Sequence, residues 1–230
     1  LAGGASTWAL ASLVFAGIDE PEAEPEDTSG QSAGDMWALV KGDRDLQRFL
    51  LVRSLMLVTA LSTPFIVVLA GDEGADLTGL GAFIIASGGA SLLGGRISGR
   101  LSDRSSKSTM AWAAGIASTV IVALVLSARM APSGVNAWVM PLGFFLVNLA
   151  HTAVRVSRKT YLVDMADGDK RTMITGASNT VMGVVLLVVG AISSAISVLG
   201  PQAALLFLAV VGYAGVVGAR NLKEVSSASA

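Results

Sequence analysis

Seven long apolar runs, separated by polar connections, most constrain what this chain can fold into. A helix needs roughly 20 apolar residues to cross a ~30 Å hydrocarbon core. Lipid cannot satisfy an open backbone, so runs of this length predict transmembrane helices, and the alternating ten-residue segments of a β-barrel are missing. The first run is Leu1–Ile18. The other six are roughly Phe49–Ala70, Leu77–Ile97, Thr109–Ala128, Val135–Val156, Thr172–Leu199 and Pro201–Ala219.

The composition agrees with an integral membrane protein. Hydrophobic residues make up 53% and charged residues 14% of the 230 residues, and the mean hydropathy is +0.66. Soluble chains are nearer ~25% charged. A net charge of -1 is too balanced for a nucleic-acid binder, so no nucleic-acid partner is expected. The absence of Cys excludes disulfides, thiolate metal sites and Cys nucleophiles.

A charged linker divides the first run from the rest. Asp19–Asp27 holds six acids in nine residues, and polar sequence continues to the basic stretch Lys41–Arg48. Such a segment cannot bury apolar surface and is expected to be solvated. The chain starts at Leu1 inside an apolar run, so we expect a fragment of a longer protein. Residues 1–18 are then expected to be the end of a transmembrane helix. A trimmed signal peptide is the alternative, although the run has no positive n-region and acidic residues follow it directly.

The Lys and Arg residues predict the orientation. If the runs alternate across the bilayer, fifteen of the sixteen basic residues fall on one side, and only Arg129 lies on the other, with Asp72, Glu73 and Asp76. Basic loops stay in the cytoplasm. The linker 19–48 and the tail 220–230 are therefore expected to be cytoplasmic, on either side of a six-helix bundle over 49–219.

The third run ends in a compact motif. Ser87, Ser91, Gly95 and Gly99 recur every four residues, a small-residue stripe that lets another helix approach closely. The segment Gly99–Lys107 reads GRLSDRSSK, in which Asp103 is placed to cap the following helix or to face its N-terminus. It resembles the signature loop of the major facilitator superfamily, G-x-x-x-D-R-x-G-[RK], with Ser106 in place of the second glycine.

The resemblance extends over the whole chain. It implies the end of family helix 6, the long central loop, and helices 7–12. The fold class it implies is an all-α integral membrane protein, a six-helix transporter half-bundle preceded by one partial transmembrane helix. The implied function is secondary active transport of a small solute by alternating access. Gly99, Asp103, Arg104 and Lys107 would then belong to a gating loop.

The resemblance also implies partners and a location. The partners would be the missing N-terminal half, the lipid bilayer and an unidentified small-molecule substrate, with a coupling ion left open. The expected location is the cytoplasmic (inner) membrane of a bacterium.

Polar residues within the runs are the candidate pathway. Asn148, His151 and Arg155 share one helical face with Thr152 beside them, and polar groups at membrane depth usually face a cavity or the bundle interior. His151 can titrate near neutral pH, so a coupling role stays open. Alternatively, Asn148 makes a structural hydrogen bond and Arg155 snorkels to the interface. The remaining candidates are Ser178, Asn179, which would meet Asn148 across the cavity, and Thr63, which precedes a kink-favouring Pro64.

The segment Arg155–Thr172 is expected to form a short interfacial helix, with Tyr161 and Leu162 in the headgroups. Trp37, Trp112 and Trp138 are expected to anchor helix ends at the interface.

Enzymatic chemistry finds no support in the sequence. No Asp or Glu lies inside a run, no Walker loop, HExxH or G-x-S-x-G motif occurs, and there is a single His. We therefore expect no enzyme activity and no cofactor.

Two alternatives to transport remain: a non-transporting receptor or assembly protein of the same fold, and an unrelated helical channel. The substrate itself cannot be read from the sequence, because one scaffold serves many solutes.

Overall fold

The computed structural model describes residues 12, 14, 33–74, 77–165 and 170–225. Contacts divide the chain into two compact units, residues 1–35 and 36–230. Most of the first unit, including nearly all of the run Leu1–Ile18 and the acidic segment Asp19–Asp27, lies outside the described residues. The architecture below is that of the second unit.

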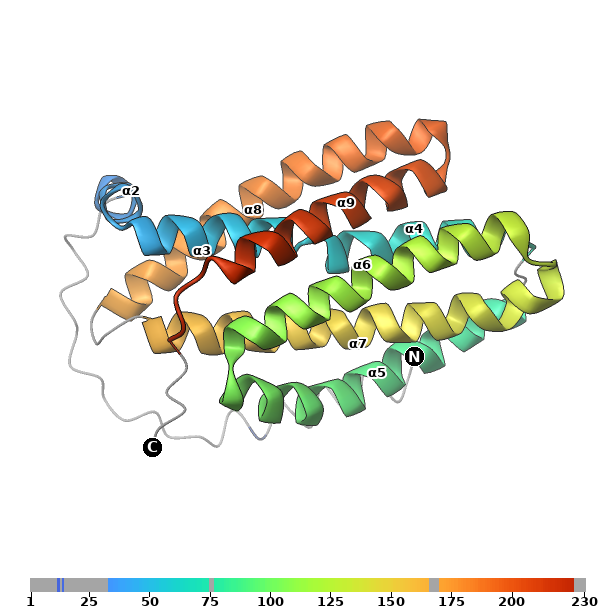
Figure 1. Cartoon of the computed structure of the whole chain (residues 1–230), viewed down its shortest axis with the longest axis horizontal. Helices are drawn as coiled ribbons and strands as arrows, with labels where there is room; N and C mark the ends of the chain where they lie inside the picture. Colours follow the sequence, from blue (N-terminus) through green and yellow to red (C-terminus); the bar gives the residue numbers. More distant parts are fainter. Residues whose placement is uncertain (1–11, 13, 15–32, 75–76, 166–169, 226–230) are drawn as a thin grey trace. The chain divides into compact units, whose positions relative to one another are not determined.

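The described residues of this unit form helices joined by short turns (Figure 1). In chain order they are α2 (Ala33–Gly42), α3 (Arg44–Leu55), α4 (Val58–Asp72), α5 (Leu77–Arg104), α6 (Ser106–Met130), α7 (Ser133–Met165), α8 (Lys170–Ile196), the short 3-10 helix η2 (Ser197–Leu199) and α9 (Pro201–Arg220). Among the described residues, six spans are long and apolar enough to cross a membrane, and each overlaps one of the six predicted runs after the linker.

Local chemistry explains where the helices begin and end. The carboxylate of Asp43 accepts hydrogen bonds from the backbone N–H groups of Asp45 and Leu46, which caps α3. The hydroxyl of Ser105 accepts from the N–H of Ser108 and caps α6. Gly200 turns the chain from η2 into α9 with φ +109°, a conformation that L side chains rarely adopt, and Pro201 follows at the first helical position.

One prediction about helix shape is wrong, and another gains detail. The first span covers the predicted run but is interrupted at Met56–Leu57, between α3 and α4. Pro64 lies inside α4, and the kink that it favours stays a prediction. Over its described part, the segment Arg155–Thr172 forms no separate interfacial helix, because α7 continues to Met165 and α8 begins at Lys170; residues 166–169 lie outside the described residues. Tyr161 is only 2% exposed and stacks on Phe49 with ring centroids 4.9 Å apart, and Leu162 is also buried. The contact with Phe49 of α3, remote in sequence, therefore holds Tyr161 in the core, and Leu162 belongs to the same buried apolar cluster.

Helices α4, α6, α7 and α9 form the centre of the bundle, while α5 packs mainly on α7, and α8 contacts α3 and α9 (Figure 1). Gly212 of α9 permits the closest approach in this centre, because a Cβ there would meet the side chains of Ser118 and Val58. Trp37, Trp112 and Trp138 are exposed, as interface anchors would be.

Hydrogen bonds fasten each end of the bundle. At the end that carries Glu73, the buried Asn136 donates to the Glu73 carboxylate at 2.9 Å and accepts from the Ser127 hydroxyl at 2.7 Å, which joins α4, α6 and α7. At the opposite end, which we call the basic end, the segment after α9 is held in place. Tyr161 donates from its hydroxyl to the carbonyl of Lys223 at 2.9 Å.

Candidate functional site

The polar face of α7 lies inside the bundle and is bonded largely to its own helix. Asn148 is half-buried and donates from Nδ2 to the carbonyl of Phe144 at 2.9 Å. Thr152 is buried and donates to the carbonyl of Asn148 at 3.1 Å. Its side chain packs on α5, where a Cβ at Gly94 would lie 2.9 Å from it. Thr152 is therefore a packing residue on the α5 side of the helix.

His151 reaches across to α4. Its Nδ1 lies 3.1 Å from the Thr59 hydroxyl oxygen, and the same hydroxyl lies 3.2 Å from the carbonyl of Met56. A hydroxyl has one proton, so both bonds form together only when Thr59 donates to Met56 and His151 donates from Nδ1. At the break between α3 and α4, the Met56 carbonyl accepts from both the backbone N–H of Thr59, at 3.5 Å, and the Thr59 hydroxyl, while His151 bonds only to that hydroxyl. Their pairing leaves Nε2 as the free acceptor of a neutral ring.

A second polar pair joins α3 to α8. Arg53 of α3 is 7% exposed, and its Nη2 donates to Oδ1 of Asn179 on α8 at 3.0 Å. Asn179 itself is exposed, and it meets Arg53 rather than Asn148 as expected from the sequence. The neighbouring Ser54 hydroxyl contacts the sulfur of Met182 at 4.0 Å. Helix α8 is thus tied to α3 by polar contacts near the start of the first span.

Positive charge accumulates around these pairs. The charge of Arg158, three residues beyond Arg155 on α7, acts on both Arg53 and His151, and that of Arg155 acts on His151. The Nε atoms of Arg53 and Arg158 are buried and have no hydrogen-bond partner. Over the described ranges, the one ion pair within 4.0 Å is Arg48–Asp45, so neither arginine is matched by a carboxylate there.

The remaining pathway candidates do not join this cluster. Ser178 is fully buried, and its hydroxyl has no hydrogen-bond partner. Thr63 is half-buried on α4, one turn beyond Thr59. The described residues bring no three His, Asp or Glu side chains together in a way that could hold a metal ion.

Sequence reasoning missed Arg53, Arg158 and Thr59 as site residues. Arg53 was not among the candidate residues, yet it lies inside the apolar run Phe49–Ala70. A charge within such a run indicates a functional position by itself. Arg158 gave no such signal, because it falls just beyond the apolar part of α7 and reads as an end residue.

The signature loop lies in the turn from α5 to α6 at the basic end. Gly99 is half-buried, whereas Asp103 and Arg104 are exposed. Of the two roles expected of Asp103, capping α6 is wrong, since α5 extends through Arg104 and Ser105 is the N-cap; that its charge faces the N-terminus of α6 stays a prediction. Lys107 donates from Nζ to the carbonyl of Leu222 at 2.6 Å, and the Ser105 hydroxyl donates to the Glu224 carboxylate at 2.9 Å. The loop is thereby bound to the segment that follows α9.

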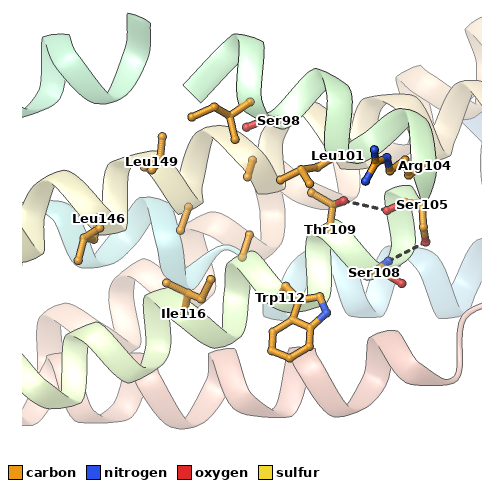
Figure 2. A pocket seen from close by; sticks show the side chains of 14 residues that line it. Ser98, Leu101, Arg104, Ser105, Ser108, Thr109, Trp112, Ile116, Leu146 and Leu149 are labelled. Atoms are coloured by element: carbon orange, nitrogen blue, oxygen red, sulfur yellow. Dashed lines mark hydrogen bonds between the residues drawn. The ribbon is translucent and has the colours of Figure 1, made fainter. Parts of the chain in front are cut away.

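An apolar groove of about 480 Å³ lies between α5, α6 and α7 (Figure 2). Figure 2 shows the aliphatic side chains of Leu101, Ile116, Leu146 and Leu149 along it, with Arg104 near the α5–α6 turn. Among the predicted site residues, only Arg104 lines it. The groove is therefore separate from the polar cluster of Arg53, His151 and Asn179.

The comparisons with known proteins agree with this architecture. No curated protein and no solved structure matches the chain significantly. The family profile described as the Major Facilitator Superfamily matches residues 3–227, nearly the whole chain. With six helices able to span a membrane and a signature-like loop between α5 and α6, this chain belongs to the major facilitator superfamily.

Proposed function

We propose that this chain is the C-terminal half of a secondary active transporter that moves a small solute by alternating access. Membership of the superfamily makes it a membrane transporter protein. The observation that carries the finer proposal is the polar cluster within the spans: Arg53 with Asn179, and Thr59 with His151, contributed by four helices. Polar and charged side chains at membrane depth are costly, and they usually mark a substrate or ion pathway.

The uneven burial of the spans supports a missing half. We compare the share of the most apolar stretch of each span that is buried inside the protein. This share is 17% for the span that contains α5 and 11% for the span that contains α8, against 39–50% for the other four spans. The small-residue stripe on α5 is unfilled, because a Cβ at Gly95 or Gly99 would find no atom within 4 Å. Two under-packed helices, one with a surface suited to close approach, fit a second half-bundle that docks on α5 and α8.

We assign the pathway to Asn148, His151 and Asn179, with Thr63, Thr152 and Ser178 behind them. His151 and Asn179 contribute to the cluster directly, and Asn148 lies one turn from His151 on the same helix. Thr152 and Ser178 are buried and Thr63 is half-buried, so in this proposal these three residues form the walls of the pathway. In this proposal the two halves rock around the cluster, which opens to one side of the membrane at a time.

Cysteine accessibility tests this assignment, and the chain has no native Cys. A single cysteine at position 148 or 151 of the reconstituted transporter should react with a water-soluble thiol reagent in at least one of its inward and outward states. A cysteine at Val147, which is 0% exposed and adjacent on α7, is the matched control and should stay protected. Protection of 148 and 151 in both states would contradict the pathway.

The gene itself tests the half-protein proposal. The reading frame upstream of Leu1 should encode about five further spans and a stronger copy of the signature loop. An upstream frame without spans would leave either a dimer of halves or a different function.

The loop residues are proposed to gate the cytoplasmic side. Asp103 and Arg104 are exposed at the basic end, free to meet a second half. Asp103→Asn should change the transport rate and leave substrate affinity nearly unchanged, because it removes a charge that stabilises one conformer by about 1 kcal/mol. Wild-type turnover in this variant would show that the loop is only a helix turn.

A further inference from the structure

Two arginines in the polar cluster lack a negative partner. Arg53 is 7% exposed, and the hydrogen bond of its guanidinium goes to a neutral amide, that of Asn179. Its Nε and the Nε of Arg158 are buried without any partner. The part of the chain that the structure describes pairs neither side chain with a carboxylate.

Such an arrangement is costly without a ligand. Burial of an unpaired charge is strongly unfavourable, and a guanidinium cannot escape the cost by losing its proton. The cost applies most directly to Arg53, which is 7% exposed, whereas Arg158 is half-buried with its Nε enclosed. Arg158, whose like charge acts on Arg53, and the exposed Arg155 on the same helix add to the repulsion. A negatively charged group would remove both penalties. Guanidinium groups present planar, paired N–H donors that match carboxylate and phosphate oxygens.

We infer that Arg53 and Arg158 bind a small soluble anion that carries a carboxylate or phosphate group, and that this anion is the transported solute. Asn179 holds the Arg53 guanidinium in place from the exposed side, and the His151–Thr59 pair supplies a neutral hydrogen-bonding edge deeper in the bundle. Asn179 is exposed, so the cluster faces the side of α8 on which the proposed second half would dock, and alternating access would admit the solute between the two halves. The inference rests on the proposed transport function and names its substrate class.

Thermal unfolding of the full chain in lipid-free neutral detergent provides the test. Sodium phosphate and sodium succinate are compared with sodium chloride at matched ionic strength. At least one of the two probes should raise the unfolding temperature in a saturable way beyond the effect of chloride. Arg53→Gln and Arg158→Gln should each weaken the apparent affinity roughly tenfold or more, as truncation of one partner of a buried charge pair does.

Lys159→Gln is the matched control. It removes one positive charge from an exposed position adjacent to Arg158 on α7, so the anion response should persist. If Arg53→Gln does not fold, Arg53→Lys keeps the charge but loses the forked donor geometry, and it should still weaken the response.

Three results would overturn the inference. Equal anion responses in the wild type and the arginine variants would show a non-specific salt effect. Stabilisation by phosphatidylglycerol in the micelles, but by neither soluble probe, would assign the cluster to a lipid headgroup. No response to any anion, with recovery on co-expression of the preceding half, would assign a carboxylate of that half as the partner.

Transport assays separate this inference from the proposed function. Anion binding without solute flux in vesicles that contain the whole transporter would contradict the transport proposal and leave the anion site. Flux of an uncharged solute without anion binding would contradict the anion site and leave the transport proposal.

Discussion

Adjacent glycines on α5 make different demands on the packing of the bundle. A Cβ at Gly94 would lie 2.9 Å from both Cβ and Cγ2 of Thr152, whereas a Cβ at Gly95 would find nothing within 4 Å. We expect Gly94→Ala to lower the free energy of unfolding by about 1–3 kcal/mol, the usual cost of overpacking. Gly95→Ala should be neutral or should stabilise the helix by up to about 1 kcal/mol. Thermal unfolding of the purified chain in detergent measures both, and equal unfolding temperatures would contradict this packing.

The hydroxyl of Thr59 is expected to matter more than its methyl group. Thr59→Val keeps the shape of the side chain but leaves Nδ1 of His151 and the carbonyl of Met56 without the hydroxyl that joins them. Unsatisfied buried polar groups cost about 1–3 kcal/mol. Thr59→Ser, the control, keeps the hydroxyl and loses one methyl group, worth about 0.8 kcal/mol. In unfolding experiments the Val variant should be the less stable of the two, and the opposite order would argue against the bond.

At the residue scale, the sequence indicated the candidate site only in part. It identified His151 and Asn179 because polar residues are rare in apolar runs, but it paired Asn179 with Asn148. The actual partner is Arg53, which lies on another helix 126 residues away in the sequence. No periodicity within one helix encodes which residue of another helix it will face. That choice depends on how the helices pack against one another, and the pattern of residues within one apolar run does not specify this packing.

At the scale of elements, the six spans were predictable because length and hydropathy alone decide whether a helix can cross lipid. Their ends were harder to place. The basic residues after Val156 made α7 appear to stop there, yet it continues to Met165 because Tyr161 stacks on Phe49 and Leu162 is buried. The break between α3 and α4 also lacked a signal, since it falls at Met56–Leu57 and no proline or glycine lies there.

The segment after α9 was expected to be a simple cytoplasmic tail, but part of it is a structural element. Leu222 is 4% exposed within the core, and Lys107, Ser105 and Tyr161 bind the segment through hydrogen bonds. Deletion of residues 221–230 should therefore lower the stability by at least the roughly 1.5–3 kcal/mol of one buried leucine. Tyr161→Phe keeps the ring stack and removes one hydrogen bond, so its cost should be about 0.5–1.5 kcal/mol.

Deletion of only residues 226–230 is the control for the tail, because it leaves all of these contacts in place. Limited proteolysis and thermal unfolding should rank the variants in that order: the short deletion nearest to wild type, then Tyr161→Phe, then the long deletion. A long deletion as stable as the wild type would mean that the segment only rests on the loop.

At the scale of the whole molecule, the orientation in the membrane is a prediction from charge. Fifteen of the sixteen Lys and Arg residues fall on one side if the spans alternate, and basic loops are retained in the cytoplasm. The described turns alternate as this requires: Ser105 separates α5 from α6 at the basic end, and Pro132 lies between α6 and α7 near the end that carries Glu73. The order of the helices decides which turns lie on the same side of the membrane. The distribution of charge predicts which of the two sides is cytoplasmic.

Reporter fusions test this orientation at four points. Fusions that end at Gly30 and at Ser105 should fluoresce with green fluorescent protein and lack alkaline phosphatase activity, since both positions are predicted to be cytoplasmic. Fusions at Gly74 and at Pro132 should show the reverse, because only an exported phosphatase is active. Gly74 is a suitable junction since it is exposed and follows α4 directly, whereas the neighbouring Glu73 binds Asn136. A mirrored pattern would overturn the predicted orientation and the cytoplasmic role of the signature loop together. Equal signals at Gly74 and Ser105 would contradict α5 as a span.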